Sequence, residues 1–254
     1  MDELERISEA AYRSFYGERV ALAGGARCLR APEAPDSPML NRVVGLGVER
    51  PATDGDVDEA LAAMGDTTCY VAISPSAAPA DLDARLEARG LEPGWGWMLF
   101  RRSAAPPPEV PTELRLVEVG REERTAWARV AATAYGLPDA VVPFIASVVG
   151  APGWACWLAL DGDEPAAAGA LWVDGDAAYF GFAGTLPQHR GKGGQGALFG
   201  ARIARALEHG CTTLVTETGE QVPGRPDSSY RNITRFGFEP QHVVAHRLRP
   251  RPAG

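Results

Sequence analysis

The chain has 254 residues, 45% of them hydrophobic and 23% charged, which is the composition of a globular protein with one large or two small domains. The formal net charge of −8 argues against a broad surface for nucleic acid and favours a cationic substrate such as an amine. No apolar run approaches the roughly 20 residues of a membrane helix, so a membrane is not an expected partner.

Two segments of the first half have counterparts in the second half. Residues 65–73 (GDTTCYVAI) resemble 210–218 (GCTTLVTET), and residues 89–102 resemble 236–249, where a glycine, a glutamate and a proline coincide. In both halves the preceding pattern is helix, strand, helix. We interpret the chain as two copies of one fold, and the alternative is chance similarity between two segments of mixed structure.

A proline-rich segment divides the two halves. Ser103–Thr112 reads SAAPPPEVPT, and such a run of prolines can neither continue a helix nor lie in a central strand. A segment of this kind is a stiff, extended linker. We therefore expect one domain over 1–102, a linker over 103–112 and a second domain over 113–254, both of ordinary domain size.

The second half alternates between strand and helix periodicity. Asp-Gly turns separate some of the strands, and glycines follow two of the helices. The predicted elements are a strand at 114–119, helices at 121–135 and 138–149, strands at 154–160, 166–173 and 177–186, a helix at 197–209, a strand at 212–218, a helix at 228–236 and a strand at 243–248. This order predicts an α+β fold, in which helices flank a mixed, mostly antiparallel sheet.

The strongest motif is the glycine-rich loop Arg190–Ala197 (RGKGGQGA), which follows a predicted strand and opens a predicted helix. Glycines let phosphate oxygens approach backbone N–H groups closely. The first N–H groups of a helix are unpaired and lie at the positive end of its dipole. Arg190 and Lys192 add formal positive charge. We interpret the loop as a pyrophosphate site, and the alternative is a flexible connector.

The surroundings of the loop exclude two common phosphate-binding motifs. A nucleotide P-loop carries its lysine after the last glycine and a serine or threonine next, whereas Lys192 comes early and Ala197 follows the last glycine. A dinucleotide-binding loop follows the first strand of a parallel unit, whereas this loop follows antiparallel strands late in the domain. ATP, GTP and dinucleotides are therefore disfavoured.

The element order and the loop resemble the GNAT superfamily of acyl-CoA-dependent N-acyltransferases. The family signature is Gln or Arg, two variable residues, Gly, one variable residue, then Gly or Ala; here Arg190 and Gly193 fit, whereas Gln195 departs from it. The helix that ends in Gly237-Phe238 is similar to the fourth helix of the family. The resemblance covers about 112–250. If the first half is a second copy of this fold, it is a degenerate copy.

The resemblance also implies where acyl-CoA binds. The pantetheine arm would lie between the ends of strands 177–186 and 212–218, paired with backbone groups of Ala183 and Thr185. The loop would hold the pyrophosphate, and Asn232 would contact the pantetheine or only position its own helix. The expected cofactor-binding residues are Ala183, Gly184, Thr185, Arg190, Gly191, Lys192, Gly193, Gly194, Gln195, Gly196 and Asn232.

Attack of an amine on the thioester would use a base for the amine and an acid for the leaving thiolate. The strand at the usual place of the family base has no carboxylate, so Glu217 is the nearest candidate base. The position of the usual acid is Ile233, so Tyr230, one helical turn earlier, is the candidate acid. Both have structural alternatives, a solvated strand-end carboxylate and a packing tyrosine. Proximity alone can supply much of the rate.

The first half lacks the loop. Its corresponding segment, 45–57, contains Glu49, Asp54 and Asp56, and these acids would repel a pyrophosphate. We expect this half to pack against the catalytic half and to shape the acceptor pocket.

The four cysteines are Cys28, Cys69, Cys156 and Cys211, none at the C-x-x-C spacing of a metal or redox motif, so no metal is expected. The first residues, MDELERISEA, are acidic and polar, unlike a secretory signal. Both features predict a reduced, cytoplasmic protein.

The favoured function is transfer of an acetyl or other short acyl group from acetyl-CoA or a related acyl-CoA to an amine on a small molecule or peptide. The alternative is a CoA-binding sensor or interaction module without turnover, because the usual carboxylate is missing and the tyrosine is displaced. The acceptor, the acyl length and the oligomeric state do not follow from the pattern.

Overall fold

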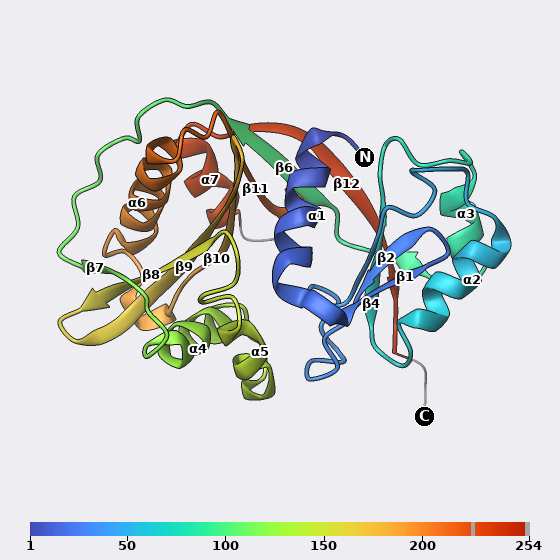
Figure 1. The fold of residues 1–254 in the computed structure, drawn as a ribbon, viewed down its shortest axis with the longest axis horizontal. Helices are drawn as coiled ribbons and strands as arrows, with labels where there is room; N and C mark the ends of the chain where they lie inside the picture. The colour runs from blue at the N-terminus through green and yellow to red at the C-terminus, as the bar shows by residue number, and fades with distance from the viewer. Residues whose placement is uncertain (225–226, 252–254) are drawn as a thin grey trace. The chain divides into compact units, whose positions relative to one another are not determined.

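The computed structural model describes residues 1–224 and 227–251 and divides the chain into two compact units (Figure 1). The first unit comprises Met1–Leu99 with His242–Gly254, and the second comprises Phe100–Gln241. Within the described residues, no helix is both long and apolar enough to cross a membrane.

The strands of the first unit lie in the order β1-β2-β3-β4-β12, and β5 also pairs with β12. Only β3 and β4 are parallel, with Val43 opposite Val71, and helix α2 connects them. Its elements are α1 (Glu3–Tyr16), β1 (Val20–Ala23), β2 (Ala26–Leu29), β3 (Arg42–Val44), α2 (Asp54–Ala63), β4 (Cys69–Ile73), α3 (Leu82–Glu87), β5 (Glu92–Pro93) and β6 (Trp97–Arg102), whose last residues belong to the second unit. Apolar side chains of α2, α3 and the sheet, among them Val57, Leu86 and Val71, form its core.

The last strand, β12 (Glu239–Arg249), corrects the predicted domain boundary. It pairs antiparallel with β4, from Ala245 opposite Ile73 to Arg249 opposite Cys69. Arg247 on this strand also makes two hydrogen bonds of 2.6 Å to Asp83. Residues 242–251 therefore pack with the first unit, whereas the sequence assigned all of 113–254 to the second domain. The boundary was wrong because strand pairing between distant segments leaves no local signal.

In the second unit the strands lie in the order β7-β8-β9-β10-β11, and among these only β10 and β11 are parallel. Its elements are β7 (Arg115–Glu118), α4 (Arg124–Ala134), α5 (Val142–Ala146), β8 (Trp154–Asp161), β9 (Glu164–Asp174), β10 (Ala177–Thr185), α6 (Gly194–Glu208), β11 (Thr213–Gly219) and α7 (Ser228–Arg235). Each predicted element is present in the predicted order. Helix α6 begins at Gly194 instead of Ala197, because the glycines form its first turn.

The two units repeat one arrangement. In each, a helix joins two parallel strands: α2 joins β3 to β4, and α6 joins β10 to β11. The two similar segments found in the sequence, 65–73 and 210–218, contain β4 and all but the last residue of β11. The predicted tandem α+β fold, with helices flanking mixed sheets, is therefore confirmed.

Candidate functional site

The candidate site lies where β10 ends and α6 begins. Gly191 and Gly193 have positive φ angles of 84° and 79°, a conformation that glycine adopts without steric penalty. The first hydrogen bond of α6 runs from the Ala197 N–H to the Gly193 carbonyl at 3.0 Å. The N–H groups of Gly194, Gln195 and Gly196 precede it and have no intrahelical partner. With the helix dipole, they form an anion-binding helix start.

The proline-rich segment packs against this loop and explains most of its glycines. A Cβ atom on Gly193 would lie 2.9 Å from the Pro111 carbonyl oxygen, and one on Gly196 would lie 2.7 Å from Val110. A Cβ atom on Gly194 would lie 3.0 Å from Leu114. Only Gly191 would place a Cβ atom with nothing within 4 Å. Contacts within the chain thus account for glycine at positions 193, 194 and 196, whereas Gly191 faces open space. That the four glycines also let a phosphate approach stays a prediction.

The charged side chains beside the loop differ in whether they can bind an added anion. Lys192 forms an ion pair with Asp161, and the Nδ1 atom of buried His189 lies 2.9 Å from the same carboxylate. The hydrogen bonds from Lys192 and His189 hold the pKa of Asp161 below its usual value. Arg190 is exposed, and no carboxylate among the described residues lies within ion-pair distance of it. Arg190 is therefore the loop cation that is available to an anion.

Gln195 departs from the family signature for a visible reason. Its side-chain amide donates a hydrogen bond to the Thr185 hydroxyl at 3.0 Å. This bond ties the first turn of α6 to the last residue of β10. The residue thus contacts the protein itself where the family usually has a small residue.

Strands β10 and β11 diverge beside the loop. Their register runs from Ala177 opposite Thr213 to Phe180 opposite Thr216, although β10 continues to Thr185. The register of β10 with β9 also shifts between Gly181 and Gly184. In this irregular segment Phe182 has a φ angle of 50°, which is strained for an aromatic residue. Ala183, Gly184 and Thr185, three of the predicted cofactor-binding residues, therefore lie on the diverging part.

Tryptophan rings hold the strained residue in place. The Phe182 ring packs edge-on against Trp127 of α4 and Trp154 of β8, each with ring centroids 5.7 Å apart. Trp127 is fully buried and its indole N–H donates to the Gly169 carbonyl at 3.3 Å. The end of β10 is thus shaped by packing before any ligand binds.

The predicted catalytic residues have different surroundings. Glu217 is half-buried on β11, just past the last residue paired with β10. Tyr230 lies on α7, and its ring packs edge-on against the fully buried Phe100 at 5.0 Å. Asn232, also on α7, is half-buried. The structure thus brings Glu217 to the divergent strands and gives Tyr230 a packing contact.

Sequence reasoning missed a buried cation at this place. Arg202 of α6 is 0% exposed, and its guanidinium lies over the rings of Phe180 and Phe199. It donates to the carbonyl oxygens of Leu198 and Ala170 at 3.0 and 3.3 Å. Burial lowers the pKa of Arg202 to about 10. Its position within the apolar stripe of the helix was the one available signal.

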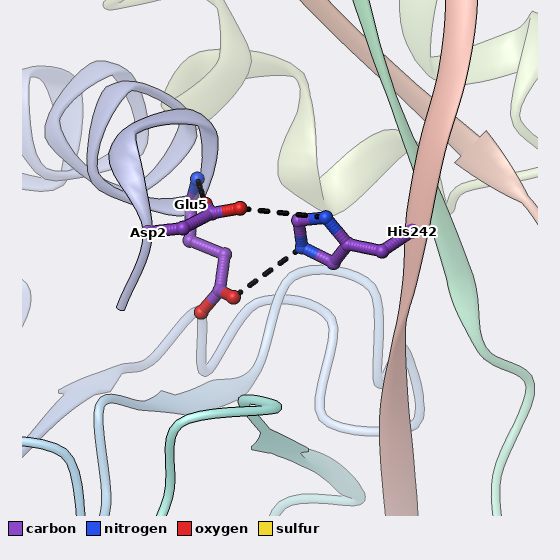
Figure 2. Close-up of side chains that lie close together, drawn as sticks. All are labelled: Asp2, Glu5 and His242. Carbon is purple, nitrogen blue, oxygen red and sulfur yellow. Dashed lines mark hydrogen bonds and ion pairs between the residues drawn. The ribbon is translucent and has the colours of Figure 1, made fainter.

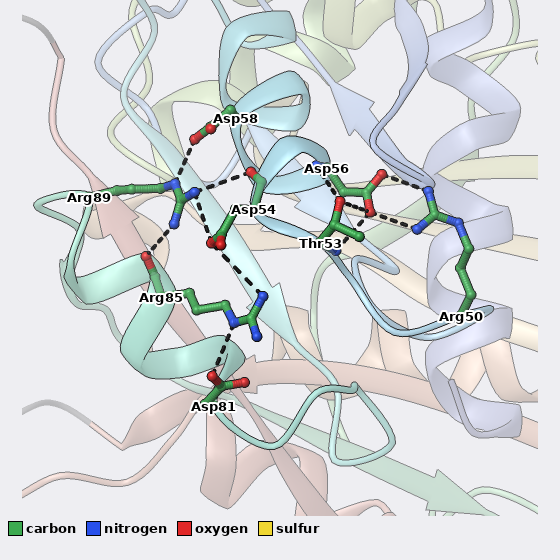
Figure 3. Close-up of polar contacts among 8 residues, drawn as sticks. All are labelled: Arg50, Thr53, Asp54, Asp56, Asp58, Asp81, Arg85 and Arg89. Atoms are coloured by element: carbon green, nitrogen blue, oxygen red, sulfur yellow. Dashed lines mark hydrogen bonds and ion pairs between the residues drawn. The ribbon is translucent and has the colours of Figure 1, made fainter.

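The corresponding helix start in the first unit is filled by the chain itself (Figure 3). Thr53 caps α2, and its N–H donates to the Asp56 carboxylate at 2.8 Å. Arg50 makes two further hydrogen bonds of 2.6 Å to the same carboxylate. These hydrogen bonds hold the pKa of Asp56 below its usual value, and those from Arg50 contribute most to the lowering. A carboxylate thus occupies the position where the second unit leaves N–H groups open.

A second polar cluster of the first unit joins α1 to β12 (Figure 2). The His242 ring lies between two carboxylates, with Nδ1 3.3 Å from Asp2 and Nε2 3.4 Å from Glu5. Within the described residues these three side chains are the one group close enough to share a metal ion. Each ring nitrogen, however, already faces a carboxylate of the chain itself. We interpret the cluster as a polar link between α1 and β12.

No protein-family model and no curated protein sequence matches the chain. Solved structures do match it. A GCN5-related N-acetyltransferase from Kribbella flavida is 25% identical, with a TM-score of 0.64, over 100% of this chain and 97% of that one. A GCN5-related N-acetyltransferase from Sphaerobacter thermophilus is 16% identical, with a TM-score of 0.66, over 89% and 76%. A tandem GNAT protein from the clavulanic acid biosynthesis pathway is 17% identical, with a TM-score of 0.62, over 98% and 88%.

Proposed function

We propose that this chain, which belongs to the GNAT superfamily of N-acetyltransferases, transfers an acetyl or other short acyl group from acyl-CoA to an amine. The observation that carries the proposal is the start of α6, where unpaired N–H groups and Arg190 lie next to two diverging strands. An extended, amide-containing ligand with a pyrophosphate at one end fits both features together.

The residues present suit acyl-CoA as the acyl donor. The N–H groups of Gly194–Gly196 and the Arg190 guanidinium would hold the pyrophosphate, with Gly191 leaving room for its oxygens. Backbone groups of Ala183 and Thr185 would pair with the amides of the pantetheine arm. Lys192 would add charge while keeping its ion pair with Asp161. Asn232 would contact the pantetheine from α7.

The chemistry would be direct attack of a neutral amine on the thioester carbonyl. Glu217, beside the divergent strands, would accept the amine proton directly or through a water molecule. The net charge of −8 favours the approach of a cationic amine. Holding both substrates in one geometry would supply a large part of the rate.

We also propose that the first unit binds no CoA. The Asp56 carboxylate, fixed by Thr53 and Arg50, stands at the start of α2 where a pyrophosphate would have to bind. Two anions at one helix start would repel each other. One molecule of CoA per chain is the expected stoichiometry.

The arginine of the loop gives a direct test. Arg190→Ala is expected to weaken CoA binding about tenfold, which is about 1.4 kcal/mol, because one charge-assisted contact to the pyrophosphate is lost. Isothermal titration calorimetry with CoA measures the affinity and the stoichiometry. The matched control is Arg129→Ala, which removes the same charge from the exposed face of α4. Wild-type protein that neither binds CoA nor gains thermal stability from it would sink the proposal.

A CoA-binding sensor without turnover is the second candidate. It is favoured by the absence of a carboxylate on the strand 179–186 and by the packing of Tyr230 against Phe100. Incubation with acetyl-CoA and a panel of amines, with detection of free thiol, separates the two candidates. Acceptor-dependent thiol release supports the enzyme, whereas CoA binding with no release supports the sensor.

A reduced, cytoplasmic location is proposed from the cysteines. All four are free and buried. Burial raises the pKa of the Cys28 and Cys69 thiols to about 11, which keeps them protonated and unreactive. Unpaired cysteines of this kind are ordinary in a reducing compartment.

A further inference from the structure

Tyr135, a tyrosine that does not lie on α7, is located beside the diverging end of β10. Helix α4 finishes at Ala134, and Tyr135 is its C-cap. The helix end touches β10 so closely that a Cβ atom on Gly184 would lie 2.3 Å from the Ala134 Cβ atom. Tyr135 therefore stands directly beside the part of β10 that no longer pairs with β11. Tyr135 as a whole residue is 40% exposed, so part of it is accessible to solvent at this place.

The Tyr135 hydroxyl lies among groups that control a proton. The Ala183 N–H hydrogen-bonds to its oxygen, and Arg202 and Glu217 both act on it electrostatically. Removal of the hydroxyl from water raises the pKa of Tyr135. The Arg202 charge and the hydrogen bond from Ala183 oppose that rise, and the Glu217 charge adds to it. A candidate acid, a candidate base and a fixed cation are thus within one small region.

Arg202 has no carboxylate partner among the described residues, although its guanidinium contacts two carbonyl oxygens and two aromatic rings. Its Nη2 atom is buried and has no hydrogen-bond partner among the described residues. A buried cation without a carboxylate partner destabilises the folded protein unless another group stabilises its charge. A tyrosinate formed at Tyr135 would be such a group, because its charge acts on Arg202 and raises the pKa of the guanidinium.

We propose that Tyr135 is the acid that protonates the leaving thiolate in the acyl transfer, and that Arg202 acts through it as a positioning residue. This inference rests on the proposed function. It replaces Tyr230, whose ring packs against Phe100, in that role.

Glu217 and Tyr135 together account for every proton that moves in the reaction. The amine nitrogen forms its bond to the carbonyl carbon as the carbon–sulfur bond breaks and the electron pair goes to sulfur. Glu217 takes one proton from the nitrogen, and Tyr135 gives its hydroxyl proton to the thiolate. The proton on Glu217 then passes to the tyrosinate, directly or through water. The net result is an amide and a free thiol, with both residues restored.

The test is the turnover of Tyr135→Phe with acetyl-CoA and an amine that the wild-type protein accepts. We expect kcat to fall about a hundredfold, as general acid catalysis predicts, while the Kd for CoA changes less than about twofold. Tyr70→Phe, which removes a hydroxyl in the first unit, is the matched control with wild-type turnover. A wild-type kcat in Tyr135→Phe, or a loss confined to Tyr230→Phe, would overturn the assignment.

The pH profile tests Arg202. The acid must be protonated, so kcat falls as pH rises through the pKa of Tyr135, which the Arg202 cation lowers. Arg202→Met is therefore expected to move the alkaline limb of kcat to higher pH, in protein whose folding is verified by circular dichroism. An unmoved limb in folded Arg202→Met would remove the positioning role. Wild-type protein that binds CoA but turns over no amine would overturn the proposed function, and Tyr135 as its acid with it.

Discussion

His246 is a titratable residue inside the core of the first unit. It lies on β12, is 4% exposed, and packs against the rings of Tyr70 and Trp97 at 5.1 and 6.1 Å. Burial, with a smaller contribution from the Arg42 charge, lowers the pKa of His246 to about 3. The folded protein thus keeps this imidazole neutral where the unfolded chain protonates it, so the free energy of unfolding must fall as pH drops below about 6.5.

The pH dependence of stability should reveal this residue. Between pH 7 and pH 5, protonation of His246 in the unfolded chain is expected to remove about 2 kcal/mol from the free energy of unfolding. Urea unfolding at both pH values measures the loss. His246→Leu, which cannot titrate, should show a loss smaller by that amount whatever its stability at pH 7. An equal loss in both proteins would contradict the folded-state pKa of His246.

At the scale of the element, α6 shows how much of a site can be predicted from the local sequence. The periodicity of Leu198, Phe199 and Ile203 predicted the helix, and its glycines predicted an anion at its start. The reason for most of those glycines was not predictable, because their neighbours, Val110 and Pro111, come from a segment far away in the sequence. Tyr135 escaped notice for the same reason, since its contact with β10 is a tertiary one.

Two glycines of α6 provide a matched comparison. Gly196→Ala would bring a Cβ atom to 2.7 Å from Val110, whereas Gly200 has nothing within 4 Å. Gly200→Ala is expected to stabilise the protein by up to about 1 kcal/mol, because alanine loses less backbone entropy in a helix. Gly196→Ala is expected to destabilise it by about 1 kcal/mol or more, because the linker must move.

Chemical unfolding of the single variants and of Gly196→Ala with Val110→Ala measures the coupling. The Val110→Ala change should restore much of the stability that Gly196→Ala loses. Equal stability changes at the two glycines would mean that the linker does not rest on the loop.

At the scale of the whole molecule, the tandem fold was predictable and its division was not. The similarity of 65–73 to 210–218 marks corresponding strands, so the repeat could be found from sequence. The pairing of β12 with β4 depends on residues more than a hundred and fifty positions apart, such as Ile73 and Ala245. No local pattern encodes such a partner, so the domain boundary was misplaced.

A shortened chain tests this division. A chain that ends at Gln241 loses the strand paired with β4, together with the bonds of Arg247 to Asp83. We expect the amides of residues 69–73 to lose protection from hydrogen exchange, because β4 becomes an unpaired edge. A chain that ends at Arg251 is the control and should keep that protection. Unchanged protection in the shorter chain would show that the first unit is complete without β12.

The pairing of β4 with β12 also sets an order of events during synthesis. β4 leaves the ribosome long before β12, by on the order of ten seconds at ordinary rates of translation. During that interval the first unit has an apolar strand with an open edge, while the second unit is still being made. The first unit can therefore complete its sheet only after the second unit has been synthesised, and until then its nascent chain carries an open strand edge.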